Sequence, residues 1–299
     1  GIKSSAMINK VCPICETNKY SFLIYKKNLP NISEADFSGR KNPDGYHYEM
    51  VRCKNCSLLY ASSIYETEIL DTLYKESAFK YLEELKVLKK TYAKCLKASE
   101  KYNINKSKLL EIGSANGFFL ECAKNYGWEH VIGFEPSLKA ISSSSLEVRD
   151  NLVNSSFEFN SKYQNYDLIF FAMLIEHVPD VNKFLSDVHK TLKNNGLFIG
   201  IAHDEMHFLS KILKSKHPII NDEHNYVFSK KSINKILQKN KFEILELTSL
   251  TNFYTINYWI KMLPKPKFLN KLKININFLK NINIGISAGN FYFIARKYE

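Results

Sequence analysis

The sequence lacks any hydrophobic run long enough to suggest a membrane protein. Its longest uninterrupted apolar run is Leu168–Ile175, far shorter than the roughly 20 residues that cross a bilayer as a helix. Residues 1–6, which precede Met7, also lack the apolar stretch of a signal peptide and resemble a cloning remnant. We therefore expect a cytoplasmic protein and leave residues 1–6 out of the reasoning about the fold.

Dense clusters of basic residues are absent as well. Lys and Arg number 42 against 30 Asp and Glu, a formal net charge of +12, but they are spread along the chain. A basic balance can indicate nucleic acid, an anionic membrane or an acidic substrate. Because no basic run is interleaved with aromatic residues, nucleic acid is the unlikely partner. The 45% apolar and 24% charged residues exclude a fully disordered chain.

Cysteine is scarce, yet four of the six cysteines form two C-x2-C pairs. These are Cys12 with Cys15 and Cys53 with Cys56. The pattern is typical of a tetrahedral structural zinc site, in which four thiolates leave no open position for catalysis. Disulfides or unrelated buried thiols are the alternatives, and disulfides are disfavoured because no secretion signal is present. We predict a zinc-binding module over residues 7–64, with an inserted loop near 28–46.

The rest of the chain alternates between helical and strand patterns. Apolar spacing predicts one or two helices in a linker over 65–106. Strands are predicted at 108–112, 130–134, near 152, 166–172, 196–202, 242–247 and 291–296, and helices at 118–126, 137–145, 181–192 and 229–240. This alternation predicts an α/β domain over 107–299, with a mostly parallel sheet covered by helices on both faces.

The first strand of this domain runs into a glycine-bearing turn that opens a helix. Gly113 permits a tight turn and Gly117 a close approach of the backbone to a nucleotide ligand. The G-x-x-x-G spacing differs from the dinucleotide fingerprint, and the lysine of a phosphate-binding loop is missing. Glu135, at the end of the second strand, is placed to bind both hydroxyls of a ribose. Glycines that serve turn geometry alone are the alternative.

Several segments together resemble class I S-adenosylmethionine-dependent methyltransferases. They are Glu111-Ile112-Gly113-Ser114-Ala115-Asn116-Gly117, Gly133-Phe134-Glu135-Pro136-Ser137, Leu174-Ile175-Glu176-His177-Val178-Pro179-Asp180, Asn195-Gly196-Leu197-Phe198-Ile199 and the closing Asn290–Lys297. The resemblance covers residues 107–299 and implies a Rossmann-like fold with a seven-stranded sheet. The N-terminal cysteine pairs resemble the zinc module that precedes this domain in sugar and surface-polysaccharide methyltransferases.

The resemblance also implies how S-adenosylmethionine would be held. Glu111, Gly113, Ser114 and Gly117 would hold its methionine part, Glu135 with the adjacent Pro136 its ribose, Ser156 and Phe157 its adenine, and Ala172, Met173 and Leu174 its methyl side. The adenine contact is the least defined, because the acidic or polar residue usual at that position is replaced by the stretch Asn154–Phe157.

Methyl transfer to a hydroxyl requires a base, and histidine is suited to that role. Two Glu-His pairs qualify. Glu223-His224, next to Asp222, resembles the pair of sugar methyltransferases in which the histidine is the base, and Glu176-His177 follows the fourth strand. We predict His224 as base, with Glu223 or Asp222 orienting it, and His177 as the second candidate. Both the pair at 223–224 and His203, His207 and His217 fall in an expected acceptor-side insertion, 203–228.

These observations predict an enzyme of polysaccharide biosynthesis that methylates oxygen on a sugar, either nucleotide-linked or part of a surface glycan. The alternatives are an RNA methyltransferase, a sugar C- or N-methyltransferase, and a zinc-containing scaffold without activity. A C-terminal cap is expected over 250–289. Its segment 254–280 mixes aromatic residues with lysines and could rest against an anionic membrane, although a solvated helical cap is the simpler interpretation. The oligomeric state stays open.

Overall fold

The structure, a computed structural model, describes residues 7–30, 44–76, 85–255 and 283–299. The helices are α1 (Thr67–Glu76), α2 (Leu85–Ser99), η2 (Glu100–Tyr102), α3 (Phe118–Asn125), α4 (Leu138–Ser142), α5 (Leu146–Arg149), α6 (Val181–Thr191), α7 (Phe208–Leu213), η3 (Lys214–Lys216) and α8 (Lys230–Lys239). The strands are β1 (Met7–Asn9), β2 (Ser21–Tyr25), β3 (Met50–Cys53), β4 (Leu59–Ala61), β5 (Ser63–Tyr65), β6 (Lys108–Ile112), β7 (His130–Phe134), β8 (Leu152–Val153), β9 (Tyr166–Ala172), β10 (Leu192–His203), β11 (Tyr226–Val227), β12 (Phe242–Thr255) and β13 (Asn283–Lys297).

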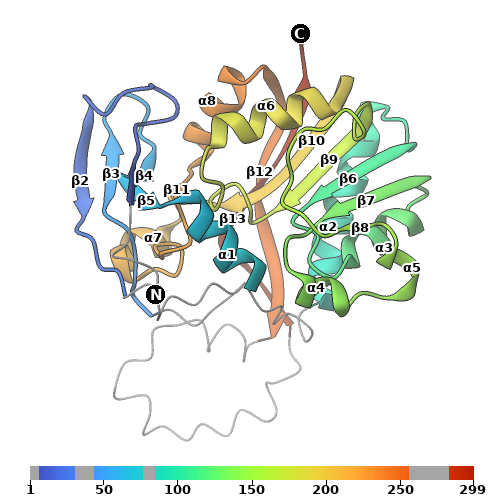
Figure 1. Ribbon diagram of the computed structural model, residues 1–299, viewed down its shortest axis with the longest axis horizontal. Helices are drawn as coiled ribbons and strands as arrows, with labels where there is room; N and C mark the ends of the chain where they lie inside the picture. The colour runs from blue at the N-terminus through green and yellow to red at the C-terminus, as the bar shows by residue number, and fades with distance from the viewer. Residues whose placement is uncertain (1–6, 31–43, 77–84, 256–282) are drawn as a thin grey trace, which may run out of the picture.

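A seven-stranded sheet forms the centre of the larger part of the molecule (Figure 1). Its strand order is β12-β13-β10-β9-β6-β7-β8. The five strands from β10 to β8 are parallel, and β13 lies antiparallel between β10 and β12. The prediction of a Rossmann-like, mostly parallel seven-stranded sheet is confirmed.

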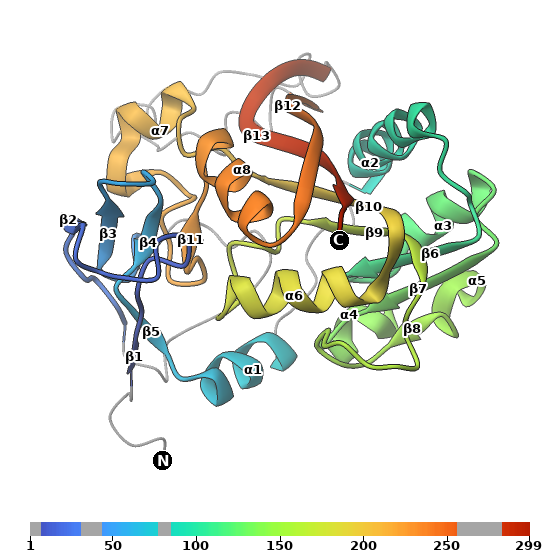
Figure 2. The same ribbon diagram turned by 90° about the horizontal axis from the view of Figure 1, so that it is seen from above.

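Strand β9 shows why its sequence is continuously apolar. Alternate side chains of a strand point to opposite faces. Leu168 and Phe170 pack with α2 and α3 on one face, while Ile169 and Phe171 pack with α6 and α8 on the other. All four are fully buried, and Figure 2 shows the two helix groups on either side of the sheet.

A second, smaller sheet lies at the opposite end of the molecule from α3 and α5 (Figures 1 and 2). It has the order β11-β4-β3-β2, and β1 pairs with β5 beside it. Three of its strands come from the N-terminal cysteine module, but β11 comes from the stretch expected as an insertion. The hydrophobic core beside this smaller sheet also combines residues from inside and outside the module. Leu70 of α1 and Ile219 and Ile220 of the expected insertion pack there with module residues.

The expected helix at 137–145 is interrupted. Ser137 caps α4 as its side chain accepts from the Ala140 amide, but the helix ends at Ser142 and α5 begins at Leu146. The hydroxyls of Ser142 and Ser143 donate back to the carbonyls of Lys139 and Ala140. Such local bonds by serine compete with helix continuation, which explains the break.

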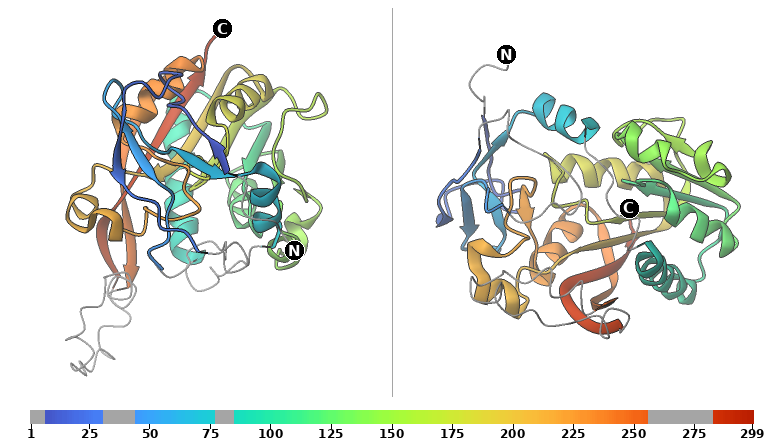
Figure 3. Two further views of the ribbon diagram at one scale, coloured as in Figure 1. Left: turned by 60° about the vertical axis from the view of Figure 1, so that its left-hand side comes forward. Right: turned by 90° about the horizontal axis from the view of Figure 1, so that it is seen from below.

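The C-terminal strands are longer than expected. Residues 250–255 and 283–289, assigned to a cap, continue β12 and β13 as a two-stranded ribbon beyond the end of β10 (Figure 3). The remainder of the expected cap, almost all of the expected membrane-facing segment, and residues 31–43 of the expected inserted loop lie outside the described residues. Among the described residues, no helix combines the length and the apolar character that a membrane span requires.

Gly200, at the centre of β10, tests the packing between the sheet and its aromatic core. A Cβ atom added there would lie 2.5 Å from Cε1 of Phe171 and 2.5 Å from Cε1 of Phe293. Both rings are fully buried and cannot move without displacing neighbours. We expect Gly200→Ala to lower the free energy of unfolding by about 1–3 kcal/mol, measured by urea denaturation.

The double variant Gly200→Ala/Phe171→Leu is the control, since the smaller side chain makes room for the methyl group. The double variant should be less destabilised than the sum of the two single variants. If the losses in unfolding free energy of the two single variants simply add in the double variant, contact with the Phe171 ring is not the cause of the destabilisation.

Candidate active site and metal centre

The loop that joins β6 to α3 is built around the carbonyl of Phe134. The amides of Gly113 and Ser114 donate to that oxygen at 2.9 and 3.0 Å. Gly113 and Gly117 have φ values of +74° and +78°, and a Cβ on them would lie 3.2 Å from Leu174 Cδ1 and 2.9 Å from Val148 Cγ2. Both positions therefore favour glycine on conformational and steric grounds.

Glu135 joins this loop to the one that follows β7. Its Oε2 accepts from the Ala115 amide at 2.9 Å and its Oε1 from the Ser137 amide at 2.8 Å. Burial raises the pKa of the Glu135 carboxyl, and the two amide donors act in the opposite direction. Each carboxylate oxygen has a further lone pair with which it can accept from a ligand hydroxyl.

Glu111 and Ser114 offer buried polar atoms with no partner of their own. Glu111 is 3% exposed and Ser114 is fully buried. Within the described residues, neither Oε2 of Glu111 nor Oγ of Ser114 has a hydrogen-bond partner. Burial, and then the neighbouring Glu135, raise the pKa of the Glu111 carboxyl well above its usual range. An unsatisfied buried carboxyl is costly, and a cationic ligand group would relieve that cost.

The other expected cofactor residues lie at the same edge of the sheet. Ala172, Met173 and Leu174, at the end of β9, are half-buried, and the Met173 amide donates to the Ile201 carbonyl at 2.8 Å. Phe157 packs edge-on against Phe134, with ring centroids 5.4 Å apart. Ser156 is exposed. The carbonyl of Pro136 accepts from Nδ2 of Asn154 at 3.0 Å, and that of Glu135 accepts from the same atom at 3.1 Å.

The histidines chosen from the sequence come together although they are distant in the chain. The ring centroids of His177 and His224 are 4.6 Å apart, and those of His203 and His224 are 5.4 Å apart. Oε2 of Glu223 lies 3.9 Å from Nδ1 of His177. Burial, and secondarily the nearby His203, lower the pKa of His177 to about 4.

A backbone carbonyl orients His224. Its Nδ1 lies 2.8 Å from the carbonyl oxygen of Ile219. A carbonyl only accepts, so Nδ1 must carry the proton and Nε2 the lone pair. The ring is 4% exposed. Asp222 and Glu223, the residues expected to orient His224, are both buried and directly precede it in the chain.

Three further residues of this cluster were not foreseen as site residues. Tyr74 of α1 lies with its hydroxyl 3.3 Å from Nδ1 of His177. Nδ2 of Asn225 donates to the carbonyls of His177 and Val178 at 2.7 and 3.1 Å. Asn290 of β13 lies with Oδ1 2.9 Å from Nδ1 of His203. Each contact joins segments far apart in the chain, so no local pattern could have indicated it.

Glu176 holds the loops of the cluster together. It is fully buried, and its Oε1 accepts from the His203 amide at 2.7 Å. Its backbone carbonyl accepts from the Asn225 amide at 2.7 Å. The loop after β9, the end of β10 and the segment before β11 are therefore fixed relative to one another at the carboxyl edge of the sheet.

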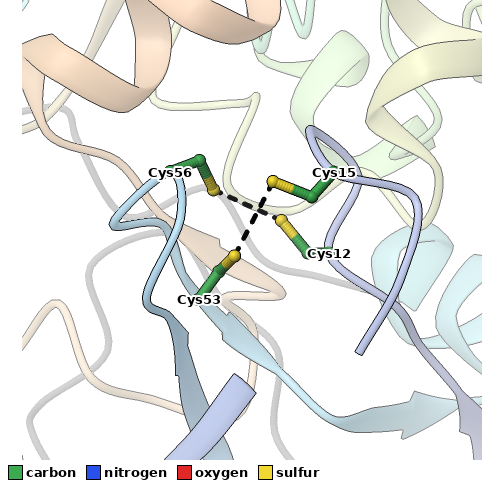
Figure 4. A group of neighbouring side chains, drawn as sticks. All are labelled: Cys12, Cys15, Cys53 and Cys56. Carbon is green, nitrogen blue, oxygen red and sulfur yellow. Dashed lines mark hydrogen bonds between the residues drawn. The ribbon is translucent and has the colours of Figure 1, made fainter. Parts of the chain in front are cut away.

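The four paired cysteines also converge (Figure 4). Their sulfur atoms all lie within 4.8 Å of one another, with 3.4 Å between Cys12 and Cys56 and 3.7 Å between Cys15 and Cys53. Four sulfurs arranged tetrahedrally around zinc at 2.3 Å would be about 3.8 Å apart. The residues therefore fit a zinc ion.

The backbone of the two cysteine pairs supports the same conclusion. The amide of Glu16 donates to the Cys12 carbonyl at 2.7 Å, and that of Ser57 to the Cys53 carbonyl at 2.8 Å. Glu16 and Ser57 both adopt left-handed conformations, with φ of 55° and 71°. The two turns thus share one geometry, which presents both thiols of each pair to a common point.

Comparison with known proteins identifies the larger part of the chain. Residues 81–247, more than half of the chain, match the family described as a methyltransferase domain. A ribosomal protein L11 methyltransferase of Prochlorococcus marinus (strain MIT 9515) is 29% identical over 145 residues. This match covers 44% of the present chain and 47% of that protein, so the chain spans about half the length of this relative.

Among the solved structures similar to this chain, one with a TM-score above 0.5 shows the same fold. A candidate methyltransferase from Bacillus halodurans C-125 is 11% identical, with a TM-score of 0.51 that covers 70% of this chain and 100% of the other. A SAM-dependent methyltransferase of Thermotoga maritima is 17% identical, with a TM-score of 0.48 over 73% of this chain and 93% of the other. With a family match over more than half of its length, a Rossmann-like sheet and a glycine-bearing loop after β6, the chain belongs to the methyltransferase domain family.

Proposed function

We propose that the protein transfers a methyl group from S-adenosylmethionine to a hydroxyl of a sugar, with His224 as the general base. The observation that carries the proposal is the position of His224. Its ring, held in one tautomer by the Ile219 carbonyl, lies beside the loop that follows β9. That loop starts at Leu174, which is next to Gly113. His224 and the Gly113 loop, which would hold the cofactor, therefore lie at the same edge of the sheet.

The unpartnered polar atoms described above match the groups of the cofactor. Glu111 would pair with the cationic amino group of its methionine part, and Ser114 would bond to the same part. Glu135 would accept from the two ribose hydroxyls, since each of its oxygens already accepts only one backbone amide. Gly113, Gly117 and the backbone near Pro136 would allow close approach, Ser156 and Phe157 would border the adenine, and Ala172, Met173 and Leu174 would line the methyl side. When bound, the cofactor supplies a methyl group on a sulfonium sulfur.

The acceptor oxygen must lose its proton as its bond to the methyl carbon forms. Nε2 of His224 would take that proton, and the electrons of the breaking carbon–sulfur bond stay on sulfur, which becomes neutral. The resulting imidazolium would keep its Nδ1–H bond to Ile219, close to the buried carboxyl groups of Asp222 and Glu223. His177 is the weaker candidate because a pKa near 4 makes it a poor proton acceptor.

Several polar groups surround this position, which favours an acceptor with many hydroxyls. Sugars linked to nucleotides or to a surface glycan have this character and fit the resemblance of the cysteine module. The Prochlorococcus relative is named for a ribosomal protein. A ribosomal protein, RNA, and the carbon or nitrogen of a sugar are therefore competing acceptors that an activity screen must include.

Cofactor binding is the first test. S-adenosylhomocysteine, titrated calorimetrically, should bind the wild type in the micromolar range. Glu135→Ala should weaken this binding at least 10-fold, because it removes the ribose acceptor and the contact that joins the two loops. Glu147→Ala, an exposed carboxylate on α5, is the matched control and should leave affinity unchanged. A folded wild type that does not bind would refute the proposal.

Replacing Glu111 should have opposite effects on the stability of the unliganded protein and on its affinity for the cofactor. Its pKa is raised in the folded state, so its contribution to stability is most favourable below its unfolded pKa and is lost as pH rises toward the folded pKa. Glu111→Gln should therefore raise the Tm of the unliganded protein at pH 7–8 while weakening S-adenosylhomocysteine binding.

The wild type should bind more tightly as pH rises through the raised pKa of Glu111, since the charged carboxylate is the form that pairs with an amino group. Glu147→Gln should change neither Tm nor affinity. A Glu111→Gln variant with lowered Tm and intact binding would contradict this account.

The base is tested once an acceptor is found among nucleotide sugars, glycans, RNA and ribosomal proteins. His224→Gln should lower kcat by about 10²–10⁴-fold while S-adenosylhomocysteine affinity stays within about twofold. His177→Gln should have a smaller effect on kcat. Equal losses in both variants, or loss of cofactor binding in His224→Gln, would show that His224 has a structural role only.

A further inference from the structure

The two histidines of the proposed active site belong to different structural bodies. His177 lies four residues before α6, which packs on the seven-stranded sheet. His224 lies two residues before β11, which pairs with β4 in the smaller sheet, Tyr226 opposite Tyr60 and Val227 opposite Leu59. The amide of Ala61 also donates to the Asn225 carbonyl at 2.9 Å. His224 is therefore fixed to the cysteine module.

The two cysteine pairs divide between the same two bodies. In the first pair, the carbonyl of Pro13 accepts from Asn182 Nδ2 of α6 at 2.9 Å and from Lys239 Nζ of α8 at 2.6 Å. In the second pair, Cys53 ends β3 and Cys56 lies in the turn to β4, the strand that carries β11. The first pair is thus tied to α6, the helix that follows His177, whereas the second pair belongs to the strands that pair with the segment of His224. Helix α8 contacts both pairs, because Lys235 Nζ also donates to the Asn55 carbonyl in the second turn at 3.4 Å.

A metal held by all four cysteines would bridge these bodies. We propose that the metal site positions His224 against His177 and so sets the geometry of the acceptor side, in addition to stabilising the module. This inference rests on the proposed function of the two histidines. The metal brace complements the contacts that Asn225 makes with the loop after β9.

A salt bridge also joins the second cysteine pair to the end of β10. Both terminal nitrogens of Arg52, the residue before Cys53, bond to the carboxylate of Glu205, and Nη1 also donates to the Ser57 carbonyl in the turn of the second pair. Glu205 comes two residues after His203, at the end of β10. The second cysteine pair is therefore joined to the end of β10 through Arg52, and to the strand that follows His224 through the pairing of β4 with β11.

Hydrogen exchange at individual amides tests the proposal without a known acceptor. The full chain should contain about one zinc per molecule. On removal of zinc with a chelator, the amides of Ala61, Asn225 and Tyr226 should exchange at least 10-fold faster, because their bonds join β4, β11 and the loop after β9. The amides of Gly113, Ser114 and Met173, in the cofactor loops, should change less than twofold.

Cys56→Ser should reproduce the effect of the chelator, and Cys122→Ser, a half-buried cysteine outside the cluster, is the matched control. Unchanged protection of the three amides after verified metal loss would overturn the proposal. The proposed function fails separately: it fails if the zinc-loaded chain does not bind S-adenosylhomocysteine.

If the metal-free chain unfolds as a whole, the proposal is tested instead by comparing the zinc-bound protein with the cadmium-bound protein. Cadmium is thiophilic and larger, with longer bonds to sulfur, so it should separate the two cysteine pairs slightly. The ring resonances of His177 and His224 should then shift more than that of His130, which lies at the other end of the parallel strands. Shifts confined to the cysteines and their neighbours would overturn the proposal.

Discussion

Parallel pairing of β6 with β9 and of β9 with β10 is the constraint on which the rest of the site depends. Parallel strands bring their carboxyl ends to one edge, and crevices at that edge are where open α/β sheets bind ligands. Here the edge carries the Gly113 loop, the segment from Met173 to His177, and His203. Strand β9 is hydrogen-bonded on both sides, with Phe171 opposite Ile112 of β6 and Ala172 opposite Ile201 of β10. Contacts between loops can therefore be short and specific.

The same edge collects buried polar groups that the fold does not satisfy internally. Glu111 and Glu176 each have a carboxylate oxygen without a partner among the described residues, and burial raises the pKa of both. Such groups lower the stability of the unliganded protein. Their concentration at one edge of a sheet whose faces are otherwise apolar is the physical mark of a ligand site, since a stability-optimised core would exclude them.

Local features of this protein could be predicted from the sequence, whereas contacts between distant segments could not. The strand at 166–172, the glycine loop and Glu135 depend on patterns of a few residues, and the structure places them as expected. The convergence of Cys12, Cys15, Cys53 and Cys56 was also readable, because metal ligation imposes a recognisable spacing. By contrast, β11 has only two residues and no strand pattern, so the strand that joins the module to the methyltransferase domain could not be predicted. The contact of Tyr74 with His177 crosses 103 positions.

The connection between the cysteine module and the methyltransferase domain follows from the size of the module. A segment of fewer than 70 residues buries too little apolar surface to be stable alone, and a metal or a neighbouring domain must supply the difference. This module packs against a neighbouring domain, and its four cysteines fit a metal ion. Its hydrophobic cluster includes Leu70, Ile219, Ile220 and Val227 from outside residues 7–64. Residues on both sides of His224, namely Ile220 and Val227, are part of the core of the module. Whenever the module is folded, that histidine is therefore held in place. Structural stability of the module and the position of His224 are then two consequences of the same packing.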